Sequence, residues 1–169
     1  MKIPRIALAA YGFAILIVIV DQLTKAWVLE GLGLRFEGQS HPVLDPFFNI
    51  TLVHNEGVSF GLFGDGSARW MLSAFSLVVA GVLGWWALKA DRRLLVTSLG
   101  LIMGGAIGNV IDRIRFGFVV DFLNFEGTGF FPWVFNVADS AITLGVILLI
   151  LDSVLSERAA KVGVAAEKS

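Results

Sequence analysis

The chain has 169 residues, of which 56% are hydrophobic and only 16% charged, and its mean hydropathy is +0.80. Soluble domains carry about 25% charged residues, so the composition predicts a single membrane-embedded domain over 1–169 and excludes a large separate soluble module. A net charge of −1 argues against a nucleic-acid partner, and the absence of cysteine excludes disulfides, thiolate nucleophiles and Cys-ligated metals.

The first predicted element is a transmembrane helix over 6–29, since its 15 uncharged residues before the first acid continue through a polar turn to about the length that a span requires. That turn holds Asp21 and Lys25, four residues apart with the acid toward the N-terminus. This order favours a structural ion pair on one helix face.

The next segment, 30–69, is interrupted by glycine and proline and does not have a helical pattern. Its aromatic and β-branched stretch over 47–53 favours strands, so we expect a small outward-facing β-sheet cradle. Phe60, Leu62 and Phe63, set between glycines, predict a short interfacial helix or turn.

Three further apolar segments predict helical spans over 70–88, 94–111 and 132–151, with a second outer segment over 112–131. The expected fold is therefore an all-α membrane protein, a bundle of four transmembrane helices. Most basic residues fall in the terminal segments and the 89–93 turn, so the positive-inside tendency places both termini in the cytoplasm. These are Lys2, Arg5, Lys89, Arg92, Arg93, Arg158, Lys161 and Lys168.

Two aspartates with apolar flanks are the strongest candidates for chemistry. Asp121 follows two valines, and Asp139 lies just before the apolar run 141–151 of the fourth span. Ionisable residues at bilayer depth are costly and usually functional. Both belong to the outer end of the bundle, where two neighbouring carboxylates would share one proton and supply the general base and general acid of peptide hydrolysis. The alternative is that each aspartate caps a turn or helix.

Polar residues around the two acids recur at helical spacing. Asn109 and Arg113 are four residues apart, and Asn136 and Asp139 are three apart, so each couple faces one direction on a helix. The four side chains are expected to line one cleft. Arg113 would there stabilise a carboxylate or bind substrate carbonyls; the alternative is an arginine that extends to the membrane interface.

These motifs together resemble the bacterial lipoprotein signal peptidases, the type II signal peptidase family of integral-membrane aspartyl proteases. The resemblance spans nearly the whole chain. The motifs that carry it are Asp21-x-x-x-Lys25, Asn55-x-Gly57 with Phe60-Gly61, Gly104-Gly105-x-x-Gly108-Asn109-x-x-Asp112-Arg113, Val120-Asp121-Phe122 and Phe135-Asn136-Val137-Ala138-Asp139-Ser140. It implies that Asp121 and Asp139 are the catalytic pair. The positions that it places around the site are Asn55, Gly57, Asn109, Arg113, Asn136 and Ala138.

The resemblance also implies the activity. Such an enzyme removes the signal peptide of a prolipoprotein just before a cysteine that carries diacylglycerol, needs no cofactor or metal, and is inhibited by globomycin. The expected partners are the lipid-modified prolipoprotein and membrane lipid, and the protein is expected to be monomeric. It would lie in the bacterial inner membrane, with its active site near the outer leaflet.

Other functions make different demands on the sequence. A serine and lysine dyad would pair Ser140 or Ser59 with Lys25, which already has an acidic partner. A metalloprotease would need clustered ligands, whereas His41 and His54 belong to no metal-binding motif. A proton-coupled transporter would carry its acids near the bilayer midplane, and a membrane scaffold would need neither aspartate.

Overall fold

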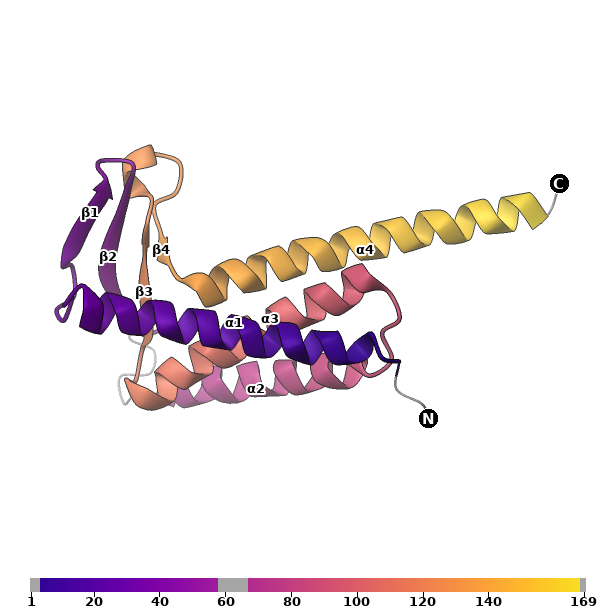
Figure 1. Ribbon diagram of the computed structural model, residues 1–169, viewed down its shortest axis with the longest axis horizontal. Helices are drawn as coiled ribbons and strands as arrows, with labels where there is room; N and C mark the ends of the chain where they lie inside the picture. The colour runs from indigo at the N-terminus through magenta and orange to yellow at the C-terminus, as the bar shows by residue number, and fades with distance from the viewer. Residues whose placement is uncertain (1–3, 58–66, 168–169) are drawn as a thin grey trace.

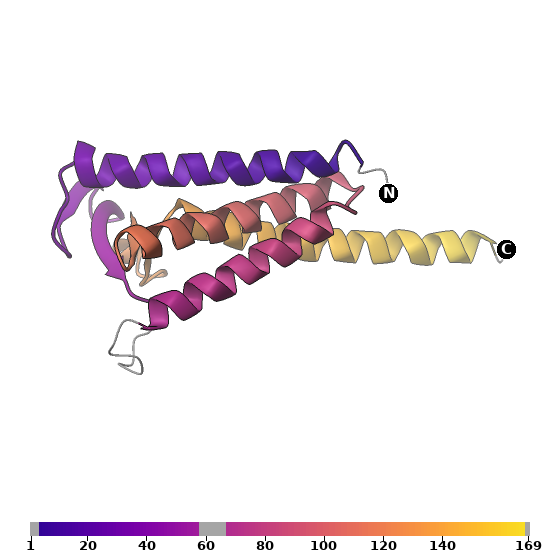
Figure 2. The same ribbon diagram turned by 90° about the horizontal axis from the view of Figure 1, so that it is seen from below.

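The computed structural model describes residues 4–57 and 67–167 (Figure 1). Four helices run lengthwise through the molecule, and each is long and apolar enough to cross a membrane. They are α1 (Ala7–Ala26), α2 (Ser67–Ala87), α3 (Arg93–Arg115) and α4 (Val137–Glu167). A small sheet stands at one end of the bundle, and α1 begins and α4 ends toward the other (Figures 1 and 2).

α3 is the central helix, because most of its residues are buried whereas only a minority are buried in each of the other three helices. Glycines allow its close contacts with both neighbours. A Cβ on Gly104 would lie 2.7 Å from the Ala14 carbonyl oxygen of α1, and a Cβ on Gly105 would collide with the Ala138 carbonyl oxygen of α4. Small residues at helix interfaces permit such backbone approach in membrane proteins. Larger side chains here would separate the helices that carry the polar residues.

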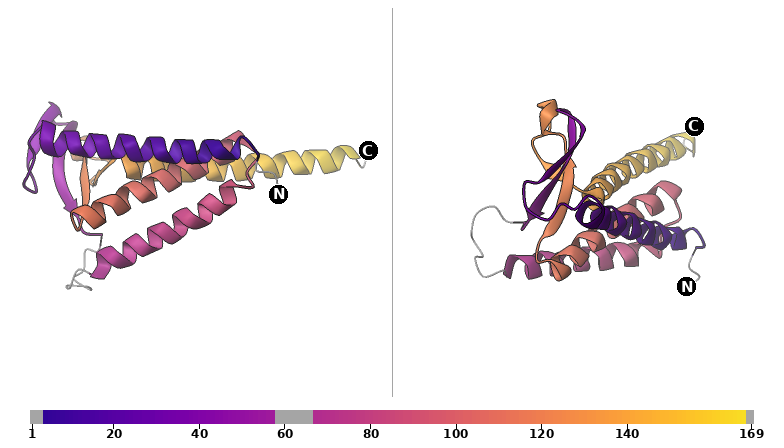
Figure 3. Two further views of the ribbon diagram at one scale, coloured as in Figure 1. Left: turned by 60° about the horizontal axis from the view of Figure 1, so that its bottom comes forward. Right: turned by 60° about the vertical axis from the view of Figure 1, so that its left-hand side comes forward.

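The sheet has four antiparallel strands in the order β1-β2-β3-β4 and stands across the end of the bundle (Figure 3). The strands are β1 (Ser40–Leu44), β2 (Phe48–Asn55), β3 (Val119–Asn124) and β4 (Val134–Phe135). Buried residues of β2 and β3 pack on Val28 and Leu34, near the end of α1, where the helix finishes in a π-helical turn, η1 (Trp27–Gly31). This apolar core holds the sheet against the helices.

The four-helix bundle and the small sheet confirm the predicted fold class, although the limits of the third and fourth helices differ from the prediction. The third helix continues past 111 to Arg115, since the carboxylate of Asp112 has an ion-pair partner inside the bundle. The fourth begins only at Val137, because 134–135 pair with β3, and it continues far beyond 151. The short interfacial helix expected at Phe60, Leu62 and Phe63 lies outside the described residues.

Candidate active site

Asp121 lies on β3 at the junction between the sheet and the bundle, and only 1% of the residue is exposed. Two side-chain amides donate to its carboxylate. Asn136 Nδ2 lies 2.6 Å from Oδ1, and Asn55 Nδ2, from the end of β2, lies 2.9 Å from Oδ2. Asp121 is thus held from both sides by neutral donors, and among the described residues no cation lies within ion-pair distance of it.

Asp139 lies in the first turn of α4 and is half-buried. Its backbone N–H donates to Asn136 Oδ1 at 2.9 Å, and the backbone N–H of Asn136 donates to Asp139 Oδ2 at 3.3 Å. This reciprocal pattern is a capping box, so the capping alternative is realised for Asp139. The other carboxylate oxygen, Oδ1, accepts from Asn109 Nδ2 at 2.8 Å. Capping therefore fixes this acid without hiding it from solvent.

One hydrogen-bond network joins the two acids. Asn136 Nδ2, which donates to Asp121, also lies 3.2 Å from Asn109 Oδ1, and Asn109 in turn donates to Asp139. Burial and, to a smaller extent, the negative charge of Asp139 raise the pKa of Asp121 to about 7. A buried acid that neighbours a second acid therefore keeps its proton near neutral pH.

A second acid pair lies directly behind the first and shares one cation. Lys25 Nζ lies 2.9 Å from Asp21 Oδ2 and 2.7 Å from Asp112 Oδ2, and all three side chains are nearly inaccessible. Asp21 Oδ1 accepts from the backbone N–H of Ala138 at 3.0 Å, and Asp112 Oδ2 accepts from that of Val120 at 3.0 Å. Since these two donors precede Asp139 and Asp121 in the chain, the pair fixes both backbones that carry the candidate catalytic acids.

Gln22 and Asp112 were not singled out from the sequence as site residues. Gln22 Nε2 donates to Asp112 Oδ1 at 2.9 Å and to Asp21 Oδ2 at 3.2 Å. The spacing could have identified Asp112, because it lies three residues after Asn109 and therefore on the same helix face, which meets Lys25. The ionic partner of Asp112 is Lys25 of α1 and not the adjacent Arg113.

Arg113 lines a cleft of about 250 Å³ between α2, α3 and α4, together with Asn109 and apolar residues such as Phe75, Val79 and Ile142. Its Nε is buried and donates to no described atom. The carboxylates of Asp139, Asp112 and Asp121 all act on its charge, although none lies within ion-pair distance. An arginine with a free buried donor beside the acids can bind an incoming carbonyl or carboxylate.

Gly57 lies next to Arg113, on a turn after β2. Its φ is +84°, a conformation that favours glycine, and a Cβ there would lie 3.6 Å from Arg113 Nη2 and collide with Leu72 Cδ1. Its N–H donates to Asn55 Oδ1 at 2.9 Å, which orients the Asn55 amide toward Asp121. The structure thus brings together Asn55, Asn109 and Asn136 with the two acids, and places Gly57, Arg113 and the Ala138 backbone around them.

Known proteins are similar to this chain in sequence or fold over nearly its whole length. Relatives described as lipoprotein signal peptidases are 50% identical over 159 residues in Caulobacter vibrioides (93% of each chain) and 44% identical over 153 residues in Shewanella loihica (88% and 87%). Two solved bacterial membrane enzymes, determined by the in meso method at 2.3 and 1.9 Å, superpose with TM-scores of 0.73 at 30% and 31% identity. They cover 90% and 85% of this chain, and 91% of each of theirs is matched. Residues 13–155 match the family signal peptidase (SPase) II, and the chain therefore belongs to that family.

Proposed function

We propose that this protein is a membrane aspartyl endopeptidase that removes the signal peptide from diacylglyceryl-modified prolipoproteins and cuts just before the lipid-modified cysteine. Its family membership supports the substrate class. The observation that carries the chemistry is the pair Asp121 and Asp139, joined through two amides and without a cation. Such a pair holds one proton between two carboxylates, which is the working state of an aspartyl protease.

The raised pKa of Asp121 suggests how the roles divide. Near neutral pH the buried Asp121 carries the proton and the more exposed Asp139 is the anion. Asp139 takes a proton from water as the water oxygen attacks the scissile carbonyl carbon, and Asp121 gives its proton to the carbonyl oxygen. When the tetrahedral intermediate collapses, a hydroxyl proton returns to Asp121 as the C=O bond forms again, the proton on Asp139 passes to the leaving nitrogen and the C–N bond breaks. A pKa close to the operating pH suits this exchange.

The cleft beside the acids gives the substrate a place. Its walls are apolar, as an acyl chain or a signal helix in the membrane requires, and Asn109 joins it to the hydrogen-bond network of Asp139. The free Nε of Arg113 would donate to a backbone carbonyl of the bound peptide. The sheet above the cleft would hold the peptide from the aqueous side.

We further propose that both termini are cytoplasmic, that the acids lie near the outer leaflet of the inner membrane, and that the enzyme works as a monomer with membrane lipid around it. The basic residues at the end of the bundle opposite the sheet support this orientation. It places the cut where a substrate anchored by both a transmembrane helix and acyl chains would present its cleavage site.

The test is processing of one lipidated precursor by purified protein in detergent, with the new N-terminus read by mass spectrometry. We expect a diacylglyceryl cysteine at that terminus and no processing by Asp121→Asn or Asp139→Asn, with Asp45→Asn, an exposed acid on the sheet, as the control. Processing by either Asn variant would remove that acid from the mechanism. A transporter or scaffold would show no cleavage by any version of the protein.

Two further measurements address substrate recognition. A precursor without diacylglycerol should be processed poorly, because the apolar cleft would lose its occupant; equal turnover of both forms would argue against lipid recognition. Globomycin should inhibit cleavage, and an active enzyme that resists it would argue against the family-like arrangement of the site.

A further inference from the structure

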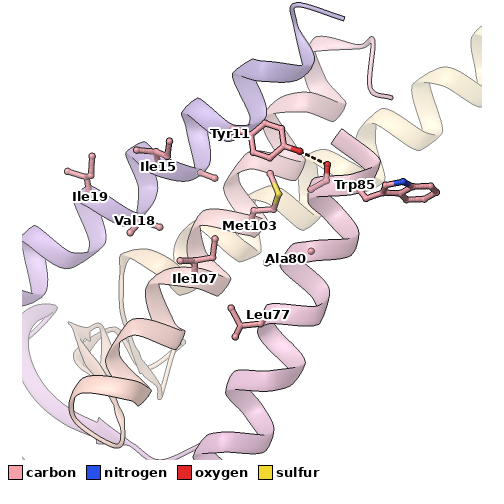
Figure 4. Close-up of a pocket in the computed structure, with 12 residues that line it drawn as sticks. Tyr11, Ile15, Val18, Ile19, Leu77, Ala80, Trp85, Met103 and Ile107 are labelled. Carbon is pink, nitrogen blue, oxygen red and sulfur yellow. Dashed lines mark hydrogen bonds between the residues drawn. The ribbon is translucent and has the colours of Figure 1, made fainter. Parts of the chain in front are cut away.

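A second, larger groove lies on another face of α3, away from the acids. It measures about 660 Å³ and is bounded by α1 and α2, with Met103 and Ile107 of α3 as its floor (Figure 4). The cleft beside Arg113 uses other α3 residues and other α2 residues, so the two share no lining residue. The groove is therefore separate from the proposed active site.

The two ends of this groove differ chemically. Toward the sheet it is lined by Ile19, Leu77 and Ile107, which are all apolar. Toward the other end it is lined by Tyr11, whose hydroxyl donates to the Gly84 carbonyl at 2.8 Å, and by Trp85, whose indole ring extends from α2 at the edge of the groove, away from α1 (Figure 4). Tyrosine and tryptophan are the residues that gather at membrane interfaces. The groove thus has one interfacial end and one hydrocarbon end.

Basic residues lie beyond the interfacial end, outside the set that lines the groove. Lys89 Nζ lies 3.8 Å from the ring centre of Trp85, and the residue is exposed. Arg5 precedes Ile6, which packs on the core cluster that includes Ala87, and so brings a second basic residue to this end. Arg93 at the start of α3 adds another, against one nearby exposed acid, Asp91. The charge there complements an anionic group.

The length of the groove matches one leaflet. From Tyr11 to Ile19 the helix rises about 12 Å at 1.5 Å per residue. Half of a bilayer core is about 15 Å thick, so a chain that starts at the interfacial end would end near the midplane. A substrate lipid would have its polar part at the opposite, sheet end. A signal peptide has a basic N-terminal region, which this basic end would repel.

From these features we propose that the groove between α1 and α2 is a binding site for one anionic glycerophospholipid, with its phosphate beside Lys89 and Trp85 and an acyl chain along Ile15 and Leu77. The leaflet is the cytoplasmic one if the orientation proposed above is right; the site itself depends on neither that orientation nor the peptidase activity. The bound lipid fills space between the first two helices that no side chain of residues 4–57 or 67–161 occupies.

The test uses the full-length protein, equilibrated with vesicles of phosphatidylglycerol and phosphatidylcholine in equal amounts, extracted into mild detergent and analysed by native mass spectrometry. We expect one phosphatidylglycerol to remain per chain. Gly81→Leu should lower its retention about tenfold, since it displaces roughly two methylene groups of the acyl chain. A Cβ at Gly81 meets no atom within 4 Å, so the new side chain extends into the groove without strain. Gly12→Leu, equally unobstructed but outside the groove, is the matched control.

A charge variant tests the headgroup. Lys89→Gln should lower phosphatidylglycerol retention about fivefold, as one basic residue near a membrane surface contributes about 1 kcal/mol, whereas Lys161→Gln, which pairs with Glu157 on the far part of α4, should not. Asp139→Asn should retain the lipid although it would not cleave, which separates this proposal from the proposed function. Equal retention of both lipids, or equal losses with Gly81→Leu and Gly12→Leu, would mean ordinary surrounding lipid only and overturn the proposal.

Discussion

Two pairs of aspartates lie side by side at one end of this bundle, and they have opposite environments. Asp21 and Asp112 share the ammonium group of Lys25 and accept backbone N–H groups, whereas Asp121 and Asp139 meet only neutral amides. A buried carboxylate is tolerated when it is paired, and otherwise takes up a proton. The first pair can therefore serve structure and the second chemistry, although the residue type is the same.

The largest expected effect separates the pairs by activity. Replacing Asp139 or Asp121 with Asn should lower kcat about 1000-fold, because general acid–base catalysis contributes at that level, while the thermal unfolding midpoint in detergent stays near the original. Asp112→Asn should instead lower the unfolding midpoint, while the protein that remains folded keeps its kcat. If all three variants lost stability to the same extent, the proposed division between the pairs would be wrong.

The next effect tests the cation. Lys25→Met leaves two buried carboxylates without a cation and should lower the free energy of unfolding by about 3–5 kcal/mol, the usual cost of breaking a buried ion pair. Denaturant titration in detergent measures it, and Lys161→Met, in an exposed pair with Glu157, is the control. Combining Lys25→Met with Asp112→Asn should restore part of the loss. If the Lys25→Met protein were as stable as the original, the ion pairs of Lys25 with Asp21 and Asp112 would contribute little to stability.

A smaller effect is expected from a change that disturbs Asp21 and Asp112 without removing a charge. A Cβ on Gly108 would lie 2.7 Å from Asp21 Oδ2, so Gly108→Ala should displace that carboxylate and cost about 1–3 kcal/mol, as overpacking does. Gly81→Ala, with open space at its Cβ, should instead leave stability unchanged or slightly raised. Equal stability of the two variants, measured by the same denaturant titration, would contradict the close packing around Asp21.

The smallest effect is a shift in pH dependence. If Asp121 must be protonated, kcat/KM should be retained below its pKa of about 7 and lost as the pH rises through it. The amide of Asn55 stabilises the ionised form, so Asn55→Ala should raise this pKa and move the alkaline limb to higher pH. Asn49→Ala, an amide on the same strand that donates to Asp45, is the control. If the alkaline limb moved to lower pH instead, the assignment of Asp121 as the protonated acid would be wrong.

The sequence predicted the spans and the sheet because long uncharged runs and glycine or proline breaks are local signals. It identified Asp121 and Asp139 as candidate catalytic acids because acids among apolar residues are rare and usually functional. The start of the fourth helix was missed because 132–136 are as apolar as the span, and only pairing with β3 makes 134–135 a strand. The part played by Asp112 was also missed, since its partner Lys25 belongs to another helix.

Asp121 belongs to a strand of the sheet and Asp139 to the helix that follows it, with Asn136 between β4 and α4 bonded to both acids. The order of the chain therefore sets the order of assembly. A partly synthesised protein that lacks the last helix has Asp121 but not Asp139. The proposed catalytic pair can form only when the final segment has entered the bilayer, so the nascent chain would not cleave the precursors around it.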